Sequence, residues 1–133
     1  IVFETKKKDF AGLERIIELA LRDNFGFPIP VILIPHKQIS ELVNEEPFAR
    51  VDVHKNIRLY VSFLKESSTT KLKLPYISKD NAFKIIGVKN KMILSVLDIT
   101  ASNTPKGMED LEKLFGKNIT TRNWNNIQKI NNC

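Results

Sequence analysis

Two apolar runs separated by a tight turn constrain the fold of this chain most. FKIIGV (83–88) and KMILSVLD (91–98) flank Lys89-Asn90, which is the pattern of an antiparallel hairpin. A third strand is predicted at IRLYVSFL (57–64), where apolar residues alternate with others and give the strand one core-facing side. Three such strands predict a largely antiparallel sheet.

Helices are predicted around this sheet. The clearest covers residues 9–25, where apolar side chains recur every three or four positions. Asp9 suits its N-cap, and Gly26 suits its end. Shorter helices are predicted at residues 38–46, and at residues 108–116, with a start near Pro105 or Gly107.

The N-terminal part holds two further predicted strands. IVFET (1–5) is expected to lead as a strand into the first helix, and IPVILIP (29–35) is a short apolar run typical of a strand covered on both sides. Residues 66–81 are polar and predict a loop or a poorly formed helix. The expected order is β-α-β-α-β-β-β-α-α, an α+β layout with helices packed on a mostly antiparallel sheet.

Composition bounds the setting of the protein. Its 133 residues, 42% hydrophobic and 27% charged, predict one globular unit with a sizeable core. The longest apolar run, Val31–Ile34, is far shorter than the ~20 residues that span a bilayer, so no membrane partner is expected. The single cysteine, Cys133, cannot form an internal disulfide, which favours a cytoplasmic location.

The net charge of +6 raises the question of a nucleic-acid partner. Nucleic-acid-binding proteins usually concentrate basic groups on one face, often with aromatic residues between them. Here the lysines are mostly scattered among acids, apart from short runs such as Lys6-Lys7-Lys8. A solvated lysine surface is therefore the favoured interpretation, and nucleic acid or a phosphate-bearing ligand remains an alternative partner.

The common catalytic and cofactor motifs do not occur in the sequence. The five glycines are isolated, so no glycine-rich phosphate cradle is present. The two histidines, His36 and His54, are not spaced as a metal-binding pair, and the adjacent acidic pairs have structural explanations near helix ends. We predict no metal, no cofactor and no catalytic residue, and we favour a protein that is not an enzyme over a small enzyme.

One C-terminal stretch, TTRNWNNIQKI (120–130), concentrates polar residues around the only tryptophan. If a final helix begins near Arg122, then Trp124 shares one side with the isoleucines of this stretch and anchors the helix on the sheet. Asn123 does not fit that apolar side, so Asn123 or Thr121 is expected to cap the helix.

The same helix start can instead be interpreted as an anion site, because backbone N–H groups, two hydroxyls and Arg122 would meet there. The candidate ligand-binding residues are Thr120, Thr121, Arg122, Asn123 and Asn125.

Taken together, several stretches resemble the bacterial family catalogued as domain of unknown function 1697. The resemblance runs over essentially all of the chain, through IVFET, FGFPIPVILIP, NEEPF, RLYVSFLKE and, most specifically, TTRNWNNIQKI. Members usually begin with an RGINVGG-like, glycine-rich segment that leads into a helix and two strands. This chain has no such segment and is similar to the C-terminal part of a member.

The resemblance implies two ferredoxin-like α/β plaits in tandem and no established activity. The first plait would be reduced to a β-α-β remnant at residues 1–35, and residues 36–133 would form the second unit, the two together making one compact body. An incomplete sheet exposes strand edges that can pair with another chain, so a homodimer is expected.

These observations favour a binding or interaction module with an anion site near Arg122. One alternative is a small enzyme in which Arg122 orients an anionic metabolite and His36 or an acid acts as the base. Another is a purely structural or oligomerisation module.

Overall fold

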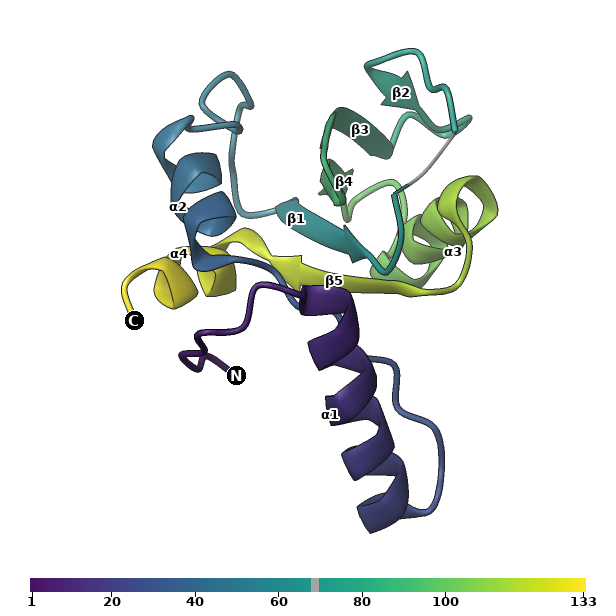
Figure 1. Ribbon diagram of the computed structural model, residues 1–133. Helices are drawn as coiled ribbons and strands as arrows, with labels where there is room; N and C mark the ends of the chain where they lie inside the picture. Colours follow the sequence, from purple (N-terminus) through teal and green to yellow (C-terminus); the bar gives the residue numbers. More distant parts are fainter. Residues whose placement is uncertain (68–69) are drawn as a thin grey trace.

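The centre of the molecule is a five-stranded antiparallel sheet with the strand order β2-β3-β4-β1-β5 (Figure 1). The computed structural model describes residues 1–67 and 70–133. The strands are β1 (Ile57–Leu64), β2 (Tyr76–Ile77), β3 (Phe83–Lys89), β4 (Met92–Asp98) and β5 (Ile119–Asn123). The α+β layout predicted from the sequence is therefore confirmed.

Four helices accompany the sheet in the described part of the chain. They are α1 (Phe10–Phe25), α2 (His36–Asn44), α3 (Thr104–Phe115) and α4 (Trp124–Asn131). The predicted caps of α1 are present, since the Asp9 side chain accepts the Gly12 N–H at 3.1 Å and Gly26 ends the helix with φ of 78°. Helix α3 begins earlier than predicted because the Asn103 side chain caps it.

The predicted hairpin forms between β3 and β4, one residue later than expected. Its turn lies at Asn90 and Lys91, with Asn90 at a φ of 54°, a conformation that asparagine tolerates better than most residues. Between the hairpin and β1, the prediction of a loop or poorly formed helix at residues 66–81 falls partly outside the described residues, at 68–69. The described remainder is irregular except for β2.

Each face of the sheet carries its own apolar cluster. Ile39 and Leu42 of α2 and Ile127 of α4 pack with Val61 and Phe63 on one face. On the other face, α3 contributes Leu111 to a cluster that includes Leu64, Phe83, Ile85, Ile93 and Leu97. The expectation of one core-facing side for β1 was therefore wrong, because α3 covers the second side as well.

Two predicted strands in residues 1–35 do not form. Residues 1–5 are irregular and exposed, and residues 29–35 are irregular and mostly half-buried. Strand structure needs a paired backbone neighbour, and neither segment has one within the described residues. The order α-α-β-β-β-β-α-β-α therefore replaces the expected one.

Carboxylates of α1 take the place of a neighbouring strand for the segment Val31–Ile34. The Glu18 carboxylate accepts the Val31 N–H, and the Glu14 carboxylate accepts the Leu33 N–H, each at 2.8 Å. An apolar segment that follows a helix can thus pair part of its backbone without joining the sheet.

Lys65, directly after β1, joins this arrangement to the sheet. Its ammonium group binds Glu14 at 3.1 Å, and it also binds Glu18 and the Val31 carbonyl oxygen. Glu14 is buried and Lys65 is largely covered, so this is a partly desolvated ion cluster. Because α1 stands away from the rest of the molecule in Figure 1, Lys65 is a principal tie between α1 and the sheet.

We expect Lys65→Met to destabilise the protein by about 1–3 kcal/mol, because it leaves two carboxylates near apolar surroundings without their cation. Urea unfolding measures the loss, and amide exchange should show it first in α1. The matched control is Lys37→Met, which removes an exposed pair with Glu41 and should change stability by less than about 0.5 kcal/mol. Equal effects of the two substitutions would contradict the assigned role of Lys65.

The contribution of this cluster should fall at acid pH. The hydrogen bond from Lys65, followed by that from the Val31 N–H, lowers the pKa of Glu18. Its stabilisation is present above the ordinary glutamate pKa and is lost as the pH falls through the lowered value. The free-energy difference between wild type and Lys65→Met should therefore shrink on acidification below about pH 4. If the free-energy difference between wild type and Lys65→Met stayed constant down to about pH 2, the ion cluster would not be the source of the difference.

At alkaline pH the stability of the ion cluster depends on the protonation of Lys65. Burial lowers the pKa of Lys65, but the hydrogen bonds from Lys65 to Glu18 and Glu14 outweigh burial and raise the pKa overall. The raised pKa keeps the cluster intact as the pH rises through the ordinary lysine range.

Candidate functional site

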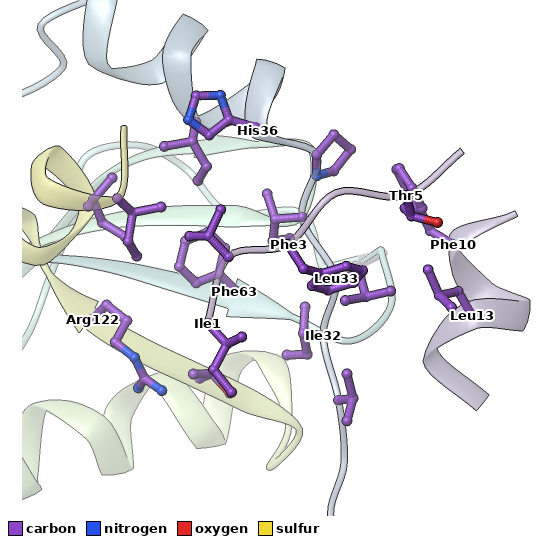
Figure 2. Close-up of a pocket in the computed structure, with 18 of the residues that line it drawn as sticks. Ile1, Phe3, Thr5, Phe10, Leu13, Ile32, Leu33, His36, Phe63 and Arg122 are labelled. Atoms are coloured by element: carbon purple, nitrogen blue, oxygen red, sulfur yellow. The ribbon is translucent and has the colours of Figure 1, made fainter. Parts of the chain in front are cut away.

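A pocket of about 750 Å³ opens on the face of the sheet that α2 and α4 cover (Figure 2). Its walls are the N-terminal segment 1–5, the segment 30–35, and parts of β1, β5 and α4. Most of the lining side chains are apolar, including Phe63 of β1 and Ile127 of α4. Pockets of this size and lining are typical of ligand-binding sites.

Thr120 and Arg122 belong to this pocket because of the register of β5. Thr120 pairs with Phe63, and Arg122 pairs with Val61, the two β1 residues that face α2 and α4. Successive side chains of a strand point to opposite faces, so Thr120 and Arg122 share that face. Both residues line the pocket.

Only part of the hydrogen-bonding capacity of the Arg122 guanidinium is used within the protein. Its Nη1 group donates to the carbonyl oxygen of Thr121 at 3.0 Å, and the side chain is exposed. No carboxylate forms an ion pair with Arg122 among residues 1–67 and 70–133. Since a guanidinium has five N–H donors in a planar fork, several remain available to an anion.

The other three candidate residues lie elsewhere. Thr121 points to the opposite face, where its hydroxyl bonds the Ser62 hydroxyl at 2.8 Å. The Asn123 side chain caps α4 by accepting the Asn126 N–H at 3.0 Å. Asn125 is exposed on the first turn of α4 and does not line the pocket. The structure therefore brings together only Thr120 and Arg122.

The expected helix start near Arg122 was wrong by two residues. Pairing with β1 draws residues 119–123 into a strand, and α4 begins at Trp124. Of the two expected caps, Asn123 fills the role and Thr121 does not, because Thr121 lies within the strand. The prediction had placed Arg122 at the helix start, whereas the two threonines before it suit a strand.

Trp124 lies at this junction of β5 and α4. It is half-buried and packs edge-on against Phe48, with the ring centroids 5.1 Å apart. It also contacts the cluster that α2 and α4 form on the sheet. Its aromatic body therefore fixes the first turn of α4 against the segment that follows α2.

His36 also lines the pocket but lies away from Arg122. Figure 2 shows the two side chains on different sides of the cavity. The His36 Nδ1 atom lies 3.4 Å from the Ser40 hydroxyl, which itself donates to the Asn131 side-chain oxygen at 2.8 Å. The structure does not place His36 beside the Arg122 guanidinium, as the enzyme alternative would need.

Sequence reasoning missed the apolar walls and the ion cluster behind one of them. Lys65, Glu14 and Glu18 hold the segment 30–35 that forms a wall. Glu14 and Glu18 are four residues apart, so they lie on the same side of α1, next to its apolar side chains. The four-residue spacing of the two glutamates beside the apolar side of α1 was the feature of the sequence that could have indicated the ion cluster.

The described residues place further bounds on the site. Within them, no group of three histidine, cysteine, aspartate or glutamate side chains gathers closely enough to hold a metal ion. None of the helices in the same residues is long and apolar enough to cross a membrane.

The cap at Asn123 can be tested against its neighbour. We expect Asn123→Ala to lower the free energy of unfolding by about 1 kcal/mol, because the Asn126 N–H loses its partner. Asn125→Ala removes the same side chain two positions along, where no cap bond is made, and should change stability by less than about 0.5 kcal/mol. Urea unfolding of the two variants checks this, and equal losses would contradict the cap.

Comparison with known proteins gives one finding. The family model described as "Protein of unknown function (DUF1697)" matches residues 1–91, about two thirds of the chain. The matched part includes the segment 30–35 and β1, whereas β5 and α4 lie beyond it. Neither the curated proteins nor the solved structures contain a match. The extent of the family match shows that the chain belongs to the DUF1697 family.

Proposed function

We propose that this protein is a binding module whose pocket takes an anionic ligand at Arg122. One observation carries the proposal: Arg122 lines an apolar pocket, and its guanidinium has no carboxylate partner in the described chain. Arginine side chains without a protein anion are well suited to carboxylate or phosphate, which they bind through two parallel hydrogen bonds.

The surroundings of Arg122 support a ligand with both a charged and an apolar part. The Thr120 hydroxyl lies on the same side of β5 and can donate to an anion. Apolar side chains such as Phe63 and Ile127 line the same pocket. An apolar lining with a few polar groups is the usual composition of a small-molecule site.

A phosphate-bearing metabolite is favoured over a nucleic acid. Nucleic-acid binding would need a continuous basic surface, whereas several lysines are engaged with acids of the fold. Lys65 binds Glu14 and Glu18, Lys89 binds Glu45, and Lys106 binds Asp80. These pairs reduce the positive charge available to a polyanion.

A binding role is also favoured over catalysis. General acid–base catalysis requires the base within about 3 Å of the proton that it removes, in the bound complex. His36 and Arg122 lie on different sides of the pocket, so one small substrate would have to reach both. The enzyme alternative is retained only for a larger ligand.

The proposal includes a cytoplasmic setting and a division of the chain into residues 1–35 and 36–133. A free, exposed Cys133 as the only cysteine fits a reducing compartment. The division is supported by the sheet, whose described strands all lie in residues 57–123, and by α1, which projects from it in Figure 1.

Arg122→Ala tests the anion site. In titrations followed by thermal shift with inorganic phosphate and with nucleotides, we expect the wild type to be stabilised and Arg122→Ala to bind roughly tenfold or more weakly. The matched control is Arg58→Ala, which removes an exposed strand arginine that also donates to a backbone carbonyl. Arg58→Ala lowers the net charge by one unit, as Arg122→Ala does.

The outcomes separate the alternatives. Loss of binding in Arg122→Ala alone supports the site, whereas equal weakening in both variants indicates nonspecific attraction by net charge. No stabilisation of the wild type by either ligand class would favour the purely structural alternative. Binding of oligonucleotides that weakens steeply with salt and ignores Arg122 would favour a nucleic-acid surface.

A further inference from the structure

A groove of about 210 Å³ lies between α3 and the edge strand β5, on the face of the sheet that α3 covers (Figure 1). Helix positions three and four apart share one side, and on α3 that side contributes Met108, Leu111 and Glu112 to the lining. Alternate positions of a strand share one face, and β5 contributes Ile119 and Thr121. We call this lined depression the α3–β5 groove.

The buried Ser62 hydroxyl fixes the direction of its hydrogen bond with Thr121. The two hydroxyl oxygens are 2.8 Å apart, and Ser62 is fully buried in β1. Within the described residues, the Ser62 hydroxyl has Thr121 as its only hydrogen-bond partner. A buried hydroxyl proton without an acceptor is costly, so Ser62 donates and Thr121 accepts. The Thr121 proton is then free, and the Thr121 side chain lines the α3–β5 groove as a hydrogen-bond donor.

Glu112 supplies the second polar group of the α3–β5 groove. Its side chain is exposed, and its carboxylate makes no ion pair or hydrogen bond with any residue in the part of the chain that the structure describes. No lysine or arginine is among the described residues that line the groove. An ammonium ion suits such a carboxylate, because it carries the opposite charge and donates hydrogen bonds. The groove therefore combines an acceptor for a cation with a neutral donor.

We propose that the α3–β5 groove binds a small aliphatic ammonium compound that carries an oxygen acceptor, as an amino alcohol does. The ammonium group binds the Glu112 carboxylate, and the oxygen accepts the free Thr121 proton. The methylene groups between them contact the apolar side chains of Met108, Leu111 and Ile119. A few polar groups on an apolar lining give such a site its selectivity.

The α3–β5 groove is separate from the proposed anion site. The two lie on opposite faces of β5, and they share no lining residue among those that the structure describes. The groove is built from residues 108–121 alone, whereas the larger pocket is lined in part by residues 1–5 and 30–35. The two sites also select ligands of opposite charge. A failure of the groove to bind a cation therefore leaves the Arg122 titrations unaffected, and the reverse also holds.

Three compounds of similar length test both polar contacts in the wild type. Aminobutanol carries both groups, butylamine lacks the oxygen, and butanediol lacks the charge. In titrations followed by amide NMR at neutral pH, we expect aminobutanol to shift the amides of the groove residues and to bind roughly fivefold or more tightly than either other compound. Aminopropanol and aminopentanol extend the test to shorter and longer spacings. If no amino alcohol of the three lengths shifts these amides, or if none is preferred over its amine and its diol, the proposal is wrong.

Two substitutions should each remove one preference. With Thr121→Val, aminobutanol should lose its advantage over butylamine and keep its advantage over butanediol, because only the donor is removed. Glu112→Gln should have the reverse effect. The matched control is Glu109→Gln, which removes an exposed acid of the same helix outside the groove and should keep both preferences.

The variant tests remain decisive if Thr121→Val alone lowers stability by leaving the Ser62 proton without an acceptor. Combining it with Ser62→Ala removes both hydroxyls, and the double variant should show the same loss of preference. The proposal is overturned if either groove substitution leaves its preference intact. It is also overturned if Glu109→Gln weakens aminobutanol binding as much as Glu112→Gln does, since general attraction by negative charge would then explain the binding.

Discussion

The contact of Lys65 with Glu14 and Glu18 is the ionic connection between α1 and the sheet, beside the apolar packing of Ile32 and Ile34 on the cluster under α2 and α4. On one side is the five-stranded sheet with α2, α3 and α4 around it, and on the other are α1 and the segment that follows it. An apolar helix face would ordinarily be buried on a sheet, yet Ile16 and Leu19 of α1 are exposed. A partly desolvated ion cluster therefore supports α1 where apolar packing is incomplete.

The sheet was predictable from the sequence because its signals are local. Alternation in β1 and the apolar runs on each side of a tight turn identify β1, β3 and β4, and Asp9 and Gly26 mark the ends of α1. The predicted strands at residues 1–5 and 29–35 failed for a non-local reason. Apolar composition predicts extended backbone, but strand structure also requires a neighbour, and the neighbours of residues 31–34 are carboxylates.

The candidate site was predicted in part. The sequence identified Arg122 and assigned Asn123 as one of two caps, but it placed the helix start two residues early and missed β5. Two consecutive threonines favour a strand, and only pairing with β1 settles that preference over the helical alternative. The strand in turn decides which residues share a face, so Thr120 accompanies Arg122 while Thr121 joins Ser62 on the opposite side.

The direct passage from β5 into α4 has a mechanical consequence. Asn123 is both the last residue of the strand and the cap of the helix, so no loop separates Arg122 from α4. A backbone displacement at Arg122 would therefore reach α4 through Asn123 alone, because no loop lies between the strand and the helix. At the far end of α4, the Ser40 hydroxyl donates to the Asn131 side-chain oxygen, so α4 is tied to β5 at one end and to α2 at the other.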